Sequence, residues 1–117
     1  MQELAREYDN SVAKCTAEEV NTDLSNNTPI NLIDVREDSE WISGHLPKAH
    51  HHALSRLTNS DVIGLPDDKS TPLTVYCGAG VRSIVASKIL ADHGYTNIRS
   101  MNGGITIWRV SNFPIVE

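Results

Sequence analysis

Apolar residues in this chain gather into short runs that are separated by polar segments rich in turn residues. The clearest run is INLIDV at 30–35, and its Ile, Leu and Val content predicts a strand buried on both faces. LTVYC at 73–77 has the same character, whereas NIRSM at 97–101 and SVAKC at 11–15 are weaker strand candidates. A further short strand is expected after the turn at Pro47. The pattern therefore predicts a chain built on short, buried strands.

Helical signals lie between these strands. Thr16 and Glu19 have the spacing of a capping box, which predicts a helix from Thr16 to about Ser25. The Asn, Thr and Pro residues at 26–29 end this helix. Shorter helices are expected at 36–44, near Ser55 and around Trp108.

The strongest helical pattern is RSIVASKILADHG at 82–94. Gly94 stands where a glycine commonly ends a helix. Residues at helical spacing predict one face that packs on the sheet. The residues expected near this face are Ile84, Val85, Lys88, Ile89 and His93.

The order of these elements sets the fold class. Strands that alternate with helices predict an α/β fold, in which the strands are parallel and helices cover both faces of the sheet. The 117 residues fit one domain, and we expect a polar lead-in at 1–10 before a single domain at 11–117. Ligands of such sheets bind beyond the carboxyl ends of strands, where Cys77 ends its run.

Charge and composition narrow the choice of partners. The formal net charge is −5 and no cluster of Lys or Arg occurs, which argues against nucleic acid or an anionic membrane as a partner. No stretch is long and apolar enough to span a membrane. Two cysteines are too few for a disulfide framework, and the polar N-terminus lacks the apolar core of a signal peptide. We therefore expect a cytoplasmic protein, or a periplasmic one if a signal peptide preceded Met1.

The segment CGAGVRS at 77–83 contains the candidate chemistry. Its two glycines permit backbone conformations that let successive N–H groups converge on one point. The start of the following helix adds unpaired N–H groups and the positive end of a helix dipole. These groups would stabilise the thiolate of Cys77, with help from the Arg82 cation and the Ser83 hydroxyl. The candidate nucleophile is Cys77, and the candidate substrate-binding residues are Gly78, Ala79, Gly80, Val81, Arg82 and Ser83.

A buried structural cysteine is the alternative, since free cysteine is among the most buried residue types. The glycine loop, the arginine and the helix start together favour a reactive thiol. Spacing then separates sulfur from phosphorus chemistry, because four residues lie between Cys77 and Arg82, one fewer than in tyrosine-phosphatase loops. The smaller loop suits one extra sulfur atom on the cysteine better than a phosphoryl group. No Gly-Lys-Ser/Thr follows the glycines, so a nucleotide-binding P-loop is excluded.

Four motifs in order resemble the single-domain rhodaneses, or rhodanese-like sulfurtransferases. LIDVRE at 32–37 is similar to the second strand of that family, and GHLPKA at 44–49 to its Gly-His-Ile/Leu-Pro-Gly-Ala turn. VYCGAGVRS at 75–83 is similar to its active-site loop. GYTNIRSMNGGITIW at 94–108 is similar to its last strand and the Gly-Gly and Trp that follow. The likeness covers the chain from about Cys15 onward.

The resemblance implies a rhodanese-like fold with a central, mostly parallel five-stranded sheet and helices on both faces. It also implies that the Cys77 thiolate takes the outer sulfur of a donor such as thiosulfate, holds it as a persulfide, and passes it to an acceptor. That acceptor is cyanide in assays and a cellular thiol or protein cysteine otherwise. The covalent intermediate implies ping-pong kinetics. The resemblance also implies that no cofactor or metal is needed. The implied partners are a small sulfur donor, a thiol or cyanide acceptor, and a sulfur-relay protein where the acceptor is a protein.

The chain departs from the family pattern at several positions. Lys48 stands where the family usually has glycine, and His51 and His52 replace a segment that usually reads Asn-Ile. Residues 78–81 have no cationic side chain, whereas some family members place Arg or Lys there to hold thiosulfate. This absence argues against tight thiosulfate binding. A low-turnover persulfide carrier or protein-binding module is therefore the alternative function, while loop length disfavours a phosphatase or arsenate reductase.

Three residues of these motifs are expected to support the loop. Asp34 and Arg36 are expected to form an ion pair or hydrogen bonds beneath it rather than to contact substrate. His45 is expected to fasten its turn by a hydrogen bond, because attack by an ionised thiol needs no general base.

The remaining candidates have structural interpretations. Adjacent residues of a strand point to opposite faces, so the histidines at 50–52 are not expected to bind one metal ion. Trp41 and Trp108 are expected to be packing aromatics. Cys15 is expected to be a small apolar core residue rather than a resolving partner of Cys77.

Overall fold

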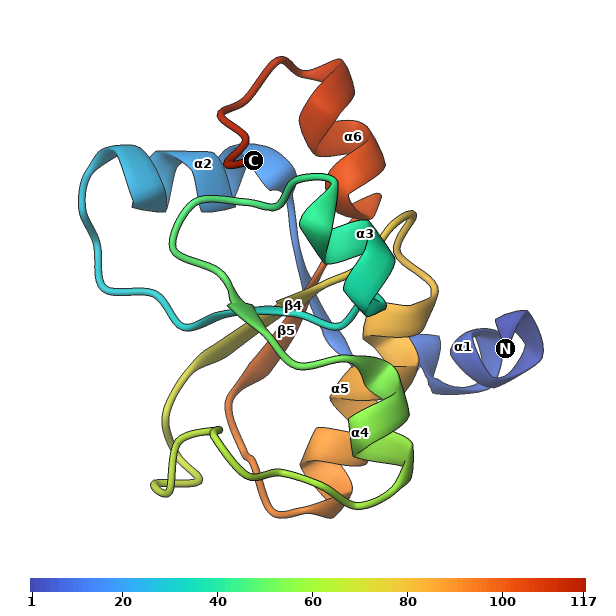
Figure 1. The fold of residues 1–117 in the computed structure, drawn as a ribbon. Helices are drawn as coiled ribbons and strands as arrows, with labels where there is room; N and C mark the ends of the chain where they lie inside the picture. Colours follow the sequence, from blue (N-terminus) through green and yellow to red (C-terminus); the bar gives the residue numbers. More distant parts are fainter.

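A computed structural model describes residues 1–117 and contains one five-stranded sheet. The strand order is β1-β5-β4-β2-β3, and all four pairings between neighbours are parallel (Figure 1). This confirms the predicted fold class. The strands are β1 Ala13–Cys15, β2 Leu32–Asp34, β3 His50–His51, β4 Leu73–Tyr76 and β5 Ile98–Met101.

Helices connect the strands and cover both faces of the sheet. On one face α1, α4 and α5 share a core with β2 and β4, and on the other α2 and α6, with Trp108 of α6, pack over β1 and β5. Two short elements, the 3₁₀ turn η1 and helix α3, contribute no buried residue. The helical elements are α1 Gln2–Tyr8, η1 Asp9–Ser11, α2 Ala17–Ser25, α3 Asp38–Ile42, α4 Leu54–Thr58, α5 Arg82–Asp92 and α6 Gly104–Val110.

Helix α2 begins as its capping box predicts. The Glu19 N–H donates to Thr16 Oγ1 over 3.1 Å, and the Thr16 N–H donates to Glu19 Oε1 over 3.0 Å. Two N–H groups at the helix start are thereby satisfied by nearby side chains. Helix α2 ends at Ser25, as predicted.

The predicted buried face of α5 is partly wrong. Val85 is buried, but the other four residues of the predicted face are only half-buried. The helix instead buries a face of small residues, which lets it approach the sheet closely while α1 and α4 pack beside it (Figure 1). Hydrophobicity alone misses this face, because serine and alanine contribute little to an apolar pattern. The buried residues of α5 are Ser83, Val85, Ala86, Ser87 and Leu90.

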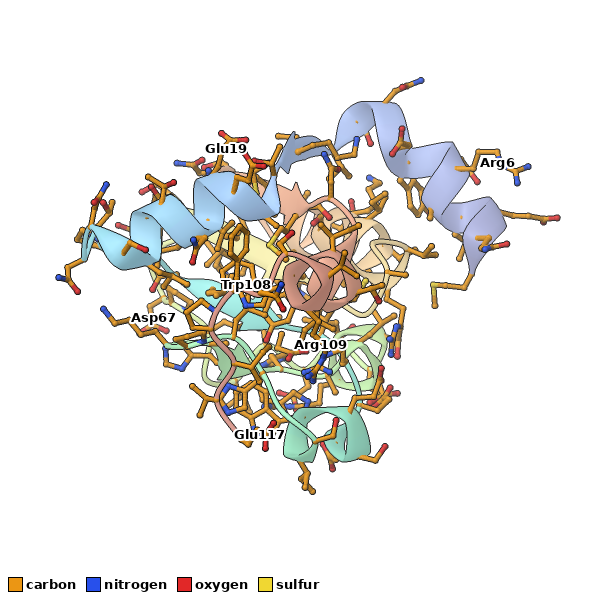
Figure 2. The ribbon with its side chains drawn as sticks, turned by 90° about the horizontal axis from the view of Figure 1, so that it is seen from above. Arg6, Glu19, Asp67, Trp108, Arg109 and Glu117 are labelled. Atoms are coloured by element: carbon orange, nitrogen blue, oxygen red, sulfur yellow. The ribbon has the colours of Figure 1, made fainter.

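The N-terminal and C-terminal segments both fold onto the domain. Residues of the polar lead-in form α1, whose Ala5 is buried in the core beside α5. At the other end, the Trp108 indole donates to Pro114 O over 2.7 Å and meets the Phe113 ring edge-on at 5.1 Å. Trp108 points into the interior, whereas Glu19 points outward from α2 (Figure 2). No helix has the length and apolar character needed to cross a membrane.

Candidate active site

Strand β4 ends at Tyr76, and the next residues form a loop that is held by the start of α6. The Ile105 N–H donates to Cys77 O over 2.9 Å, and the Thr106 N–H donates to Gly78 O over 3.0 Å. The first amides of a helix have no partner within the helix, so these two bonds satisfy both sides. The loop carbonyls are thereby turned toward α6.

Gly104 makes this close approach of α6 possible. A Cβ at this position would lie 2.5 Å from Gly78 O and would also overlap Cys77 O. Its φ of +56° is in the left-handed region, which glycine adopts without a steric penalty. The second glycine of the Gly-Gly pair noted in the sequence therefore has a steric function beside the loop.

The thiol of Cys77 lies inside the loop. The Gly80 N–H donates to Cys77 Sγ over 3.1 Å, and the residue is only 1% exposed. Gly80 has a φ of +99°, a conformation that favours glycine and that turns its N–H back toward the sulfur. Helix α5 begins at Arg82, so its positive end also faces this region. Both features favour a negative charge on the sulfur.

A chain of buried hydroxyls lies beneath the thiol. Ser83 Oγ is 3.5 Å from Cys77 Sγ, and Ser100 of β5 donates to Ser83 Oγ over 2.8 Å. The Cys77 thiol and Ser100 both donate to Ser83 Oγ, so the hydrogen of the Ser83 hydroxyl is not used in these bonds and can turn to the sulfur when the sulfur is ionised. The Ser87 hydroxyl donates to the backbone carbonyl of Ser83 over 2.7 Å and has no bond to the other two hydroxyls. The sequence analysis missed Ser100, although a polar residue in a buried strand position was a usable signal.

Arg82 is paired with Glu40 of α3. Nη1 and Nη2 of the guanidinium lie 2.6 and 2.8 Å from the two carboxylate oxygens of Glu40. The hydrogen bond from Arg82 lowers the pKa of Glu40 from its ordinary value to about 2. Arg82 was expected to stabilise the thiolate as a cation, and the structure shows that its charge is paired with that of Glu40. The sequence analysis missed Glu40, because it lies 42 positions from its partner.

Gly78 leaves space for this ion pair. A Cβ on Gly78 would lie 2.8 Å from Nη2 of Arg82 and 3.8 Å from Oε2 of Glu40. The guanidinium therefore packs directly against the loop backbone. Any larger residue at this position would push the end of the arginine side chain aside.

Asp34 and Arg36 form a buried ion pair at the end of β2. Arg36 Nη2 lies 2.8 Å from Asp34 Oδ2 and also donates to Gly44 O over 2.7 Å. The Tyr76 hydroxyl donates to Asp34 Oδ2 over 2.6 Å, and burial, with Asp34 nearby, raises the pKa of this phenol above its usual range. The network joins the end of β4 to the turn at Gly44. It has no bond to the thiol, which agrees with a supporting position.

His45 is held within its turn. Its Nδ1 lies 2.9 Å from Leu46 O, and its backbone exchanges two hydrogen bonds with Val116, at 2.9 and 2.8 Å. The ring stacks on Trp41 with centroids 3.6 Å apart and planes at 1°. These contacts tie the turn to α3 and to the C-terminal segment.

Comparison with known proteins identifies the family. A sequence model described as "Rhodanese-like domain" matches residues 16–111. The chain belongs to the rhodanese-like domain family. The matched residues extend from the start of α2 to the end of α6.

Relatives of the domain include proteins with sulfurtransferase names. A protein named "Sulfurtransferase" from Allochromatium vinosum is 28% identical over 90% of this chain and 95% of its own length. The "Thiosulfate:glutathione sulfurtransferase" of Saccharomyces cerevisiae is 34% identical over 66% of this chain and 63% of its own length. The chain spans between 19% and 63% of the length of the first four curated relatives that it matches.

A solved structure from Rhodopseudomonas palustris has the same fold, with a TM-score of 0.82 over 96% of this chain and 90% of its own. That structure is described as one of a protein of unknown function and possible tyrosine phosphatase. At 22% identity the likeness concerns the fold alone. The likeness shows that the two chains share one α/β fold, and it does not bear on the reaction.

Lys48 is a departure from the rhodanese-like pattern with a visible consequence. Its φ is +64°, in the left-handed region that is uncommon for residues other than glycine. The family glycine would occupy this conformation freely. Lys48 therefore holds a strained backbone in the turn that precedes β3.

The neighbouring histidines and Cys15 lie apart from the thiol. His51 Nε2 is bonded to Arg36 O and His52 Nε2 to Asp61 O, each at 2.7 Å. No group of three or more His, Cys, Asp or Glu side chains could hold a metal ion. Cys15 packs in the core on the opposite face of the sheet from the Cys77 core, and burial raises its pKa to about 11. Its position agrees with a packing residue.

Proposed function

We propose that this rhodanese-like protein is a sulfurtransferase that uses Cys77 as the nucleophile. The observation that carries the proposal is the Gly80 N–H that donates to Cys77 Sγ at the start of α5. An amide, a helix N-terminus and a nearby hydroxyl all favour the ionised sulfur. A reducing compartment, the cytoplasm, suits this chemistry, since both cysteines are free thiols.

In the first half-reaction Cys77 receives a sulfur atom. The Cys77 thiolate attacks the outer sulfur of a donor such as thiosulfate, a new S–S bond forms, and the bond between the two sulfurs of the donor breaks. The bonding electrons leave with sulfite, and Cys77 becomes a persulfide anion. We expect the Gly80 amide and the Ser83 hydroxyl to donate hydrogen bonds to this group, because both lie beside Cys77 Sγ.

In the second half-reaction the Cys77 persulfide passes its outer sulfur to an acceptor. A thiolate acceptor attacks the outer sulfur of the persulfide, takes that sulfur, and releases the Cys77 thiolate. Cyanide would give thiocyanate in the same way. Each step exchanges one S–S bond or forms one C–S bond, so the cycle needs no oxidant, metal or cofactor. The expected kinetics are ping-pong.

In this scheme the residues of the site divide into those of the loop and those that support it. Gly78, Ala79, Gly80 and Val81 supply backbone, Ser83 supplies a hydroxyl, and Arg82 closes the loop through Glu40. Asp34, Arg36 and His45 hold the ends of β4 and of the preceding turn through the contacts described above, and we propose no substrate contact for them.

A low-turnover persulfide carrier is the second candidate, and one observation favours it. The thiol is 1% exposed, and residues 77–83 line none of the five cavities of the protein. A small donor therefore has no preformed cleft that would hold it against the sulfur. A protein that presents its sulfur from a protruding side chain, such as a partner in a sulfur relay, avoids this need.

Mass spectrometry tests the proposal directly. Incubation with thiosulfate or with methanethiosulfonate should add one sulfur atom to Cys77, and dithiothreitol should remove it. Cys15→Ser is the matched control and should still acquire a sulfur atom on Cys77, because Cys15 lies in the core on the other face of the sheet. If Cys77→Ser acquires a sulfur atom as readily as the wild type, or if neither donor adds sulfur to the wild type, the proposal is wrong.

Steady-state turnover separates the two candidates. Repeated transfer to cyanide or glutathione supports the enzyme, whereas a trapped persulfide with negligible turnover supports the carrier. Hydrolysis of p-nitrophenyl phosphate that depends on Cys77 would instead support a phosphatase.

A further inference from the structure

The active loop contains one charged side chain, and that charge is balanced. Residues 78–81 are Gly, Ala, Gly and Val, so Arg82 is the only cation of the loop. Both of its terminal nitrogens are bonded to Glu40, at 2.6 and 2.8 Å. The low pKa of Glu40, about 2, keeps that carboxylate ionised at neutral pH. The pair therefore contributes no net charge to the surroundings of the thiol.

The position of Glu40 is fixed by more than this ion pair. Its Oε1 also accepts the Glu37 N–H over 3.0 Å and so caps α3. The next residue, Trp41, stacks on His45 at 3.6 Å and on His51 at 4.9 Å between ring centroids. Helix α3 is thus attached to two segments that precede and form β3. The capping bond and the stacking of Trp41 therefore help to hold the partly exposed carboxylate beside Arg82.

A neutral loop treats sulfur donors differently according to their charge. Thiosulfate has two negative charges and must approach a cysteine that reacts as a thiolate. With Arg82 already neutralised, no uncompensated side-chain cation in the loop offsets this repulsion. The repulsion grows with each unit of charge on the donor. Donors with one negative charge or none are affected less.

Resting on the proposed function, we propose that Glu40 is a specificity-determining residue, which neutralises Arg82 and thereby selects low-charge sulfur donors over dianions. The class that fits is an organic persulfide or a thiosulfonate monoanion. With a persulfide R–S–SH, the Cys77 thiolate bonds to the outer sulfur and the S–S bond of the donor breaks. The thiolate RS⁻ leaves with the electron pair, and the proton stays on the transferred sulfur.

Glu40→Gln is the informative variant. A glutamine keeps an oxygen that can accept from the Glu37 N–H and from Arg82, but it removes the negative charge. Asp38→Asn is the matched control, because it removes the same charge from the same helix while its carboxylate, 91% exposed, lies beside His51 and not beside Arg82.

The first measurement uses alkylation and does not depend on sulfur transfer. Iodoacetate and iodoacetamide both alkylate a thiolate, but only iodoacetate is charged. Glu40→Gln should raise the rate of alkylation of Cys77 by iodoacetate, divided by the rate with iodoacetamide, by roughly three- to tenfold, since Arg82 then acts as an uncompensated cation. Asp38→Asn should leave the ratio within about twofold of wild type. An unchanged or lower ratio in Glu40→Gln overturns the inference.

The second measurement uses donors. Thiosulfate is a dianion and methanethiosulfonate a monoanion, and both transfer one sulfur. Glu40→Gln should raise kcat/KM for thiosulfate relative to methanethiosulfonate by a similar factor, and Glu40→Gln combined with Arg82→Gln should return the ratio toward wild type. A ratio that stays raised without Arg82 overturns the inference. If wild type accepts neither donor, the proposed function fails, while the alkylation ratio still decides whether Glu40 neutralises the loop.

Discussion

Replacement of Gly104 by alanine should damage both the fold and the loop. The new Cβ would lie 2.5 Å from Gly78 O and 2.7 Å from Gly78 C, contacts with backbone atoms that a side-chain rotation cannot relieve. Helix α6 must therefore move away from the loop. Its bonds from Ile105 to Cys77 O and from Thr106 to Gly78 O, at 2.9 and 3.0 Å, would lengthen or break.

The magnitude follows from two contributions. An alanine at the φ of +56° of Gly104 costs roughly 1–2 kcal/mol relative to glycine. Loss of one or both hydrogen bonds adds about 1 kcal/mol for each. The free energy of unfolding should therefore fall by roughly 2–4 kcal/mol, a large part of the stability of a small domain.

Gly64→Ala separates strain from collision. Gly64 has a φ of +98°, but a Cβ there would meet no atom within 4 Å. This variant should lose only the backbone contribution, about 1–2 kcal/mol, and should keep the wild-type rate of persulfide formation.

The assay is urea unfolding of the three proteins at one pH, with the rate of sulfur loading measured beside it. Gly104→Ala should have the lower midpoint of the two variants at unchanged m, and it should load sulfur more slowly than Gly64→Ala. If both variants unfold at the same urea concentration and load sulfur equally fast, α6 does not fix the loop and the reasoning is wrong.

Three further predictions concern Ser100, Lys48 and His52. Ser100→Ala should slow sulfur transfer by roughly three- to tenfold because the hydrogen bond that orients Ser83 is lost; the effect should vanish in a Ser83→Ala background, and Ser87→Ala, whose hydroxyl bonds only to backbone, should change transfer rates little. Lys48→Gly should raise the free energy of unfolding by about 0.5–1 kcal/mol, since relief of the left-handed backbone exceeds the added chain entropy; a lower urea midpoint would contradict this. Burial lowers the pKa of His52, so below about pH 6.5 the unfolded chain binds a proton that the folded protein binds only at lower pH; stability should therefore fall as the pH decreases below about 7, and a slope equally steep in His52→Gln would show that another group is responsible.

Local sequence determined the elements of this protein and its reactive segment. The capping box at Thr16 and Glu19 needs only residues three positions apart, and it appears in the structure as predicted. The alternation of apolar runs with helical segments likewise sufficed for a parallel α/β sheet. Cys77 and its glycines are adjacent in the chain, so the loop could be found from spacing alone.

Tertiary structure alone decided how the loop is held and charged. Glu40 reaches Arg82 across 42 positions, and Ser100 reaches Ser83 across 17. Neither partner is adjacent to the loop in sequence, and each contact exists only because α3 and β5 pack beside it. The small residues that α5 buries were missed for the same reason, because close approach to the sheet is a property of packing and not of hydrophobic pattern. Sequence thus located the thiol, while the packing of α3, β5 and α6 around it set its hydrogen bonds and its electrostatic surroundings.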